Sequence, residues 1–144
     1  MFRHLAGVAE IVDDFPAALA FYRDTLGFEV KQQMGDDYAI VVVPGVLHFG
    51  VWNRSHAAEC TFGNRAEADR VPLGFTLELE VDQIDQAAER IAASGCPLVQ
   101  PPREEPWGQT TCRALAPGGG LLGFAVTSWA RWLAQPPQAA AGDV

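Results

Sequence analysis

The chain has 144 residues and a hydrophobic content of 49%, which suits one domain with a sizeable core. It has no apolar run long enough to span a membrane, no signal-peptide pattern and only three cysteines without CxxC spacing, so a cytoplasmic protein with reduced thiols is expected. The net charge of −8 disfavours nucleic acid as a partner; it either serves solubility alone or helps to attract a cationic ligand.

The first half of the chain predicts a strand, a helix and three further strands. A short apolar strand leads into a helix that Asp13 or Asp14 caps and that Gly27 ends. The apolar face of this helix has spacings of three and four residues, in the order Phe15, Leu19, Tyr22 and Leu26. The three strands are expected at 28–34, 36–43 and 46–52.

The second half repeats this order, which makes the chain an internal duplication of a β-α-β-β-β unit. A strand begins at Gly74, and the helix after it ends at Gly95. The helix has an apolar stripe of Ile84, Ala87, Ala88 and Ile91, and strands are expected at 96–102, 110–117 and 120–126. Residues 53–73 are predicted as a linking loop, 128–134 as a C-terminal turn and 135–144 as a disordered tail.

Two stretches of the sequence resemble a known family. "AFYRDTLGFEV" and "EPWGQTTCRALAPGGGLLGF" are similar to the helix-strand and strand-turn-strand segments of the vicinal oxygen chelate superfamily, which contains glyoxalases, bleomycin-resistance proteins and extradiol dioxygenases. The resemblance implies an α+β fold with two tandem β-α-β-β-β modules that form curled mixed sheets around a cavity, usually in a homodimer. The modules correspond to about 2–52 and 74–127, within a single domain at 1–134.

The resemblance also implies where a metal would bind. Members that use a metal place one ligand on the first and one on the last strand of each module. The matching positions in this chain are Gly7, His48, Thr76 and Gly123. Only His48 has a side chain that binds a divalent metal well, so neither a metal site nor a cofactor is predicted.

Strand alternation determines which side chains face the cavity. Leu47, Phe49 and Val51, and likewise Leu122, Phe124 and Val126, are expected to face the helices. Glu78 and Glu80 are expected on the polar face of their strand, and a slip of register by one residue would bring them or Glu10 into the cavity. Without a slip, we expect Glu10 to pair with Arg3 or Arg23 or to line the pocket, and we favour the pair.

Aromatic residues and one histidine are the candidate ligand-binding residues: His48, Trp52, Trp107, Tyr38 and Phe62. Aromatic walls hold planar or apolar molecules by burial and stacking. The sequence therefore favours metal-free binding of a small planar or cationic molecule, similar to the bleomycin-resistance branch, with antibiotic sequestration as one form. A metal-dependent glyoxalase-like lyase or ring-cleaving dioxygenase is the alternative, and an accessory protein that acts through dimer contacts is a third reading.

Overall fold

The computed structural model describes residues 1–128 and contains two modules with the predicted β-α-β-β-β order. The first consists of β1 (Phe2–Val12), α1 (Phe15–Ala20), a π-helical turn (Phe21–Thr25), β2 (Glu29–Gln32), β3 (Tyr38–Val42) and β4 (Phe49–Asn53). The second consists of β5 (Gly74–Val81), α3 (Ile84–Ala93), β6 (Leu98–Glu104), β7 (Thr110–Leu115) and β8 (Leu121–Val126). The predicted C-terminal turn, beyond residue 128, and the predicted tail lie outside the described residues.

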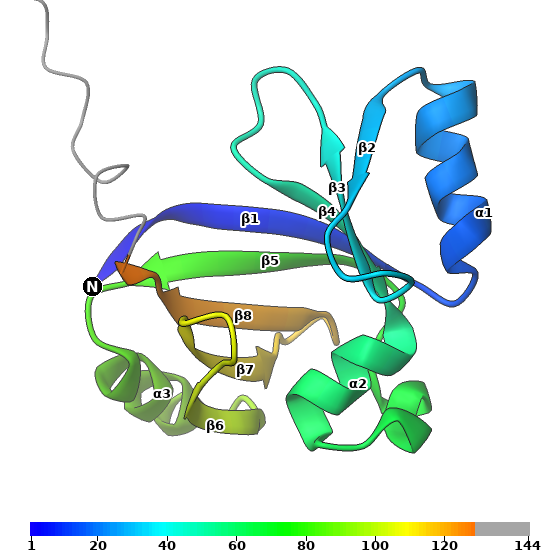
Figure 1. Ribbon diagram of the computed structural model, residues 1–144. Helices are drawn as coiled ribbons and strands as arrows, with labels where there is room; N and C mark the ends of the chain where they lie inside the picture. The colour runs from blue at the N-terminus through cyan, green and yellow to red at the C-terminus, as the bar shows by residue number, and fades with distance from the viewer. Residues whose placement is uncertain (129–144) are drawn as a thin grey trace, which may run out of the picture.

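The eight strands form one mixed sheet in the order β2-β3-β4-β1-β5-β8-β7-β6. The modules join where β1 and β5 pair antiparallel, with Gly7 opposite Glu78 and Ala9 opposite Thr76. Within each module the first strand also pairs in parallel with the last, β1 with β4 and β5 with β8. Figure 1 shows β1, β5 and β8 side by side, with the β2–β4 hairpins rising from one end. The predicted fold class, a curled mixed sheet with a few helices, is confirmed.

Each module packs its helix on the same face of the sheet. The predicted helix stripes are buried there, with Phe15, Leu19 and Tyr22 from the first module and Ile84, Ala87 and Ala88 from the second. Leu26 is the exception and is 47% exposed, because the π-helical turn closes with a bond from its N–H to the Phe21 carbonyl and rotates it off the stripe. None of the helices in the described part of the chain is long and apolar enough to cross a membrane.

The prediction of a linking loop at 53–73 is wrong, because this segment contains the helix α2 (Arg54–Phe62) and a 3₁₀ helix (Arg65–Arg70). Asn53 caps α2 by accepting the Ser55 N–H at 3.1 Å, and Gly63 ends it in the left-handed conformation. The segment lacks a long apolar stripe, which is why periodicity missed it. Its small residues Ala57 and Ala58 are nevertheless buried against Ile11 of β1, so α2 closes one end of the sheet.

The cap of α2 gives the first testable prediction. Asn53→Ala removes the acceptor for the Ser55 N–H and the donor to the Asp36 carbonyl, so we expect a loss of about 1–2 kcal/mol in the free energy of unfolding. Urea denaturation of the full chain measures this loss. Asn53→Asp keeps the capping oxygen and should recover most of the stability. Equal losses in both variants would show that the cap does not stabilise α2.

Candidate functional site

A cavity of about 610 Å³ opens on the face of the sheet opposite α1 and α3. Side chains from β1, β3, β4, β5 and β7 contribute to its wall, so both modules are needed to form it. Its volume lies within the range of about 300–1,000 Å³ that small-molecule sites occupy. The cavity is therefore the candidate functional site.

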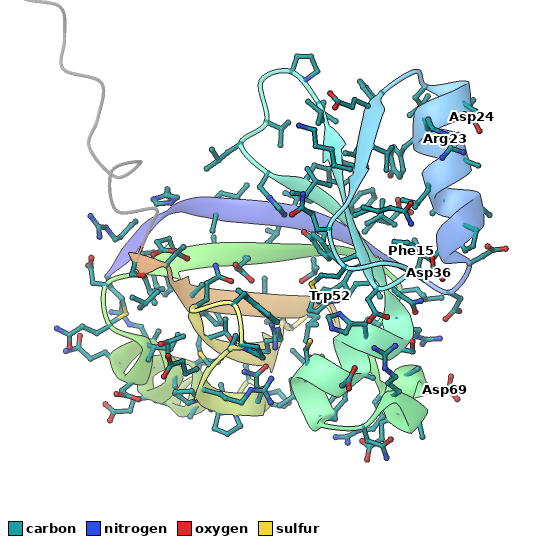
Figure 2. The ribbon with its side chains drawn as sticks, in the orientation of Figure 1. Phe15, Arg23, Asp24, Asp36, Trp52 and Asp69 are labelled. Carbon is teal, nitrogen blue, oxygen red and sulfur yellow. The ribbon has the colours of Figure 1, made fainter. Side chains whose placement is uncertain are left out.

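Four of the five predicted ligand-binding residues lie around this cavity: Tyr38, His48, Trp52 and Trp107. In Figure 2, Trp52 lies near the centre of the molecule, where the strands meet α2, whereas Phe15, the first residue of α1, packs against the sheet. Trp107, in the turn before β7, is 39% exposed at the rim of the cavity. That these residues contact a ligand stays a prediction.

Phe62 lies elsewhere. It is the last residue of α2, packs against the cluster around Ile11, and has the guanidinium carbon of Arg70 at 3.9 Å from its ring centroid. It is not among the residues that line the cavity. The sequence placed it on a loop near the cavity mouth, whereas the helix in that segment turns it toward the 3₁₀ helix that follows.

Tyr38 and His48 form a hydrogen-bonded pair in the cavity wall. Tyr38 Oη lies 2.5 Å from His48 Nε2, and the two rings are stacked with centroids 5.9 Å apart. Burial lowers the pKa of His48, while burial and the nearby Glu78 carboxyl raise the pKa of Tyr38. At neutral pH the phenol therefore keeps its proton, and it shares a hydrogen bond with a neutral imidazole. Gly50 makes room for this pair, since a Cβ there would overlap the Tyr38 hydroxyl.

His48 lies just before β4 rather than within it. The predicted inward side chains, His48 and Trp52, do face the cavity, and Phe49 and Val51 pack on the helix side as expected. Leu47 was expected on the helix side, and this is wrong: it lines the cavity and is 59% exposed. Strand alternation applies only from Phe49, where β4 begins, so it could not place Leu47.

Glu78 lies in the cavity between two glycines. It pairs with Gly7 across β1–β5 and with Gly123 across β5–β8, so the three residues form a row across the centre of the sheet. Its side chain leans over Gly123, where a Cβ would lie 3.4 Å from Glu78 Oε2. It remains partly exposed to the cavity, yet it lies deep in the protein. Burial is the largest cause that raises its pKa, Glu80 and Glu105 add to it, and Arg113 and Gln109 act in the opposite direction.

The expectation that Glu78 and Glu80 enter the cavity only after a register slip is wrong. Both line it in the observed register, because they share the face of β5 on which Thr76 lies. Glu80 is buried and accepts the Thr127 N–H at 2.7 Å and the Thr127 hydroxyl at 2.8 Å. Alternation from Thr76 was the sequence signal that would have found both carboxylates.

Glu10 faces the opposite side of the sheet and accepts a short hydrogen bond from the Tyr22 hydroxyl. The expected pairing with Arg3 or Arg23 is therefore wrong. Those arginines pair with Asp82 and Asp24, which are nearer to them on the surface. Glu10 holds the first helix against β1.

A buried polar network beneath the cavity was missed by the sequence analysis. Arg113 of β7, which is 3% exposed, lies 3.3 Å from Glu105 Oε1 and donates to Gln100 Oε1. Its guanidinium carbon lies 5.3 Å from the ring centroid of Trp52. Alternation in β7 would have indicated it, since Cys112 packs toward α3 and its neighbour must face the cavity. The network places a cation, largely balanced by Glu105, behind the aromatic wall.

Trp107 and Gln109 connect the rim to the carboxylates. The indole N–H of Trp107 donates to Gln109 Oε1 at 2.7 Å. The Gln109 amide in turn donates to the Thr127 hydroxyl at 2.8 Å and to Glu78 Oε1 at 3.3 Å. The orientation of the rim indole is therefore linked to the position of the Glu78 side chain.

The residues at the four expected ligand positions do not fit a divalent metal. All four line the cavity, but Gly7 and Gly123 offer no donor and the Thr76 hydroxyl donates to the Leu121 carbonyl at 2.6 Å. A Cβ on Gly7 would lie 3.1 Å from His48 Cδ2, so the imidazole occupies the space that a ligand on β1 would need. Within residues 1–128, no group of three or more histidine, cysteine or acidic side chains is arranged to hold an ion.

Two modules in one curled sheet, with a cavity formed by both, define the class of protein. The profile of the Glyoxalase/Bleomycin resistance protein/Dioxygenase superfamily matches residues 4–124, and the chain belongs to that family. No curated protein matches the chain significantly.

Solved structures share the fold at low sequence identity. A glyoxalase/bleomycin resistance protein/dioxygenase superfamily member from Vibrio splendidus 12B01 is 21% identical, with 88% of this chain and all of that chain (100%) covered and a TM-score of 0.57. A structure described as NAD-dependent benzaldehyde dehydrogenase from Legionella pneumophila is 18% identical, with coverages of 83% and 96% and a TM-score of 0.58.

A third structure is a variant of methylmalonyl-CoA epimerase from Streptomyces coelicolor in complex with 2-nitronate-propionyl-CoA. It is 15% identical, with coverages of 89% and 99% and a TM-score of 0.57. At these identities the comparisons establish the fold alone, and the descriptions differ in chemistry. The function of this chain must be argued from its own cavity.

The raised pKa of Glu78 predicts a stability cost at neutral pH. When a carboxyl group has a higher pKa in the folded than in the unfolded state, the protein becomes less stable as the pH rises from the unfolded-state pKa to the folded-state pKa. Glu78→Gln removes this cost, so we expect a higher melting temperature than wild type at pH 8 and no gain at pH 4. Thermal denaturation across this range measures the difference.

The exposed Glu89 of α3 supplies the control. Glu89→Gln should follow the wild-type melting temperature at every pH. If Glu78→Gln lowered the melting temperature at pH 8, the carboxylate would be stabilised by its surroundings, which would contradict the raised pKa.

Proposed function

We propose that this chain binds a small, planar, positively charged organic molecule in the cavity without a metal ion, and that it holds the molecule rather than converting it. The observation that carries the proposal is the composition of the wall. Aromatic side chains and the incompletely paired carboxyl group of Glu78 occupy the region in which related folds would hold metal ligands. Sequestration of a toxic compound, such as an antibiotic, is the biological role that fits such binding.

The aromatic part of the wall supports a planar ligand. Tyr38 and Trp52 meet edge to face, with centroids 6.3 Å apart, so each ring already has a neighbour that fixes its orientation. The Trp107 indole is anchored by Gln109 at the rim and leaves a face open to solvent. A flat ring system between these walls buries apolar area, and each aromatic contact adds about 0.5–1.5 kcal/mol beyond that area.

The charges around the cavity support a cation. Arg113 is the lining residue with a permanent positive charge, and Glu105 lies against its guanidinium. Glu78 and Glu80 then remain as the acidic groups of the wall. The chain as a whole carries a net charge of −8, which also favours the approach of a cation. The homodimer and the cytoplasmic location expected from the sequence stay predictions.

Substitution of Trp107, whose indole lies at the rim of the cavity, tests this proposal. We expect 9-aminoacridine, a planar cation, to bind the full chain at one site per protomer in isothermal titration calorimetry, with or without EDTA. Trp107→Ala should weaken binding by about 2- to 12-fold, because one stacking surface is lost, and Trp107→Phe should recover most of the affinity.

Two results would contradict the proposal. One is an affinity that Trp107→Ala leaves unchanged. The other is binding that EDTA abolishes and a divalent ion restores, together with turnover of an α-keto thiol adduct or a catechol. The second result would favour the metal-dependent lyase or dioxygenase.

A further inference from the structure

Glu78 differs from the other acidic side chains around the cavity in how its oxygens are used. Both oxygens of Glu80 accept hydrogen bonds from Thr127, and Glu105 accepts from Arg103, Thr111 and Arg113. Glu78 Oε1 accepts only the 3.3 Å bond from Gln109. Among residues 1–128, no group donates to Glu78 Oε2. Glu78 is partly exposed to the cavity, so a ligand bound there can reach this oxygen.

The two strands that flank Glu78 contribute no side chain beside this oxygen. The neighbours of Glu78 across the sheet are Gly7 and Gly123, and neither has a side chain to cover it. His48 covers Gly7 from above, and its Nε2 is already engaged by Tyr38. The cavity wall here consists of the Tyr38–His48 pair over Gly7 and the Glu78 side chain over Gly123, and Glu78 Oε2 is the acceptor to which none of residues 1–128 donates.

We propose that Glu78 anchors the ligand of this cavity by pairing Oε2 with a protonated nitrogen that carries an N–H group. The inference rests on the proposed function and adds the chemical class of the ligand: a protonated aromatic amine or amidine. A quaternary nitrogen supplies charge but no donor, and a neutral heteroaromatic supplies neither. The N–H group would fill the unused acceptor while the ring lies against the aromatic wall.

Binding of such a cation requires Glu78 to be ionised. Because burial raises its pKa, the free protein keeps a proton on Glu78 to higher pH than an ordinary glutamate does, and the bound cation expels that proton. Affinity should then rise with pH and become constant once the free carboxyl is ionised. The other titratable or charged groups that line the same cavity are His4 of β1, Tyr38 of β3, His48, His56 of α2, Glu80 of β5 and Arg113 of β7.

Three acridines of the same ring size separate the contributions of ring stacking, positive charge and N–H donation to the affinity. At pH 8, 9-aminoacridine is a cation with N–H donors, N-methylacridinium is a cation without them, and acridine is neutral. We expect affinity in calorimetry to fall in that order, with about 10- to 100-fold between 9-aminoacridine and acridine. Below the pH at which the affinity becomes constant, proton release, measured from the buffer dependence of the binding enthalpy, should accompany the two cations and not acridine.

The Glu78→Gln variant keeps the shape of the side chain and removes its charge. We expect it to lower the affinity for 9-aminoacridine by about 10- to 100-fold and to change the affinity for acridine by no more than about twofold. It should also abolish the proton release. Glu89→Gln removes an equal charge from the exposed face of α3 and should change none of these quantities. It shows whether net charge alone accounts for the effect.

The outcomes distinguish this inference from the proposed function. If 9-aminoacridine and acridine bind equally and Glu78→Gln changes neither, the anchor is refuted while planar binding stands. Equal affinities for N-methylacridinium and 9-aminoacridine would refute the N–H contact, and the charge of the ligand would then be the sole basis of its pairing with Glu78. If none of the three binds the wild-type chain, the proposed function fails, and the inference fails with it.

Discussion

The antiparallel pairing of β1 with β5 is the constraint on which the cavity depends. It joins two modules that each place a helix on one face of the sheet, so the opposite faces meet in one cavity. It also fixes Gly7 opposite Glu78, and the parallel pairing of β5 with β8 extends this row to Gly123. A change of one residue in this register would turn Glu78 away from the cavity. The chemistry of the site is therefore a property of the strand register.

Two glycines in this row change what the cavity can bind. At Gly7 the missing side chain admits the His48 imidazole, and at Gly123 it admits the carboxyl group of Glu78. The space that metal ligands would take at these two positions is filled by the His48 imidazole, which bonds to Tyr38, and by the carboxyl group of Glu78. A carboxyl group that is buried but underused costs stability, and such costs are typical of binding sites that must pair with a ligand. We interpret the cavity as a receptor for an organic cation.

Much of the fold could be predicted from the sequence, because the helix caps and apolar stripes are local. Asp14 and the Phe15–Leu19–Tyr22 face behave as their spacing indicates. The helix at Arg54–Phe62 could not be found in this way, since its buried contacts are alanines and a cap from Asn53. In the site, alternation placed Trp52 correctly, but pairing partners such as Tyr38–His48 and Arg113–Glu105 depend on contacts between strands that no local pattern encodes.

The ionisation of Glu78 is the most direct test of the central claim that this carboxyl group lies deep in the free protein with one oxygen that no described group uses. Glutamate labelled with ¹³C at the carboxyl carbon allows its titration to be followed by NMR, with the Glu78→Gln variant to assign the signal. We expect one glutamate to titrate above the ordinary range in the free protein and to move to lower pH when 9-aminoacridine is bound. A Glu78 that titrates at or below the ordinary glutamate value, and does not respond to the cation, would contradict the account.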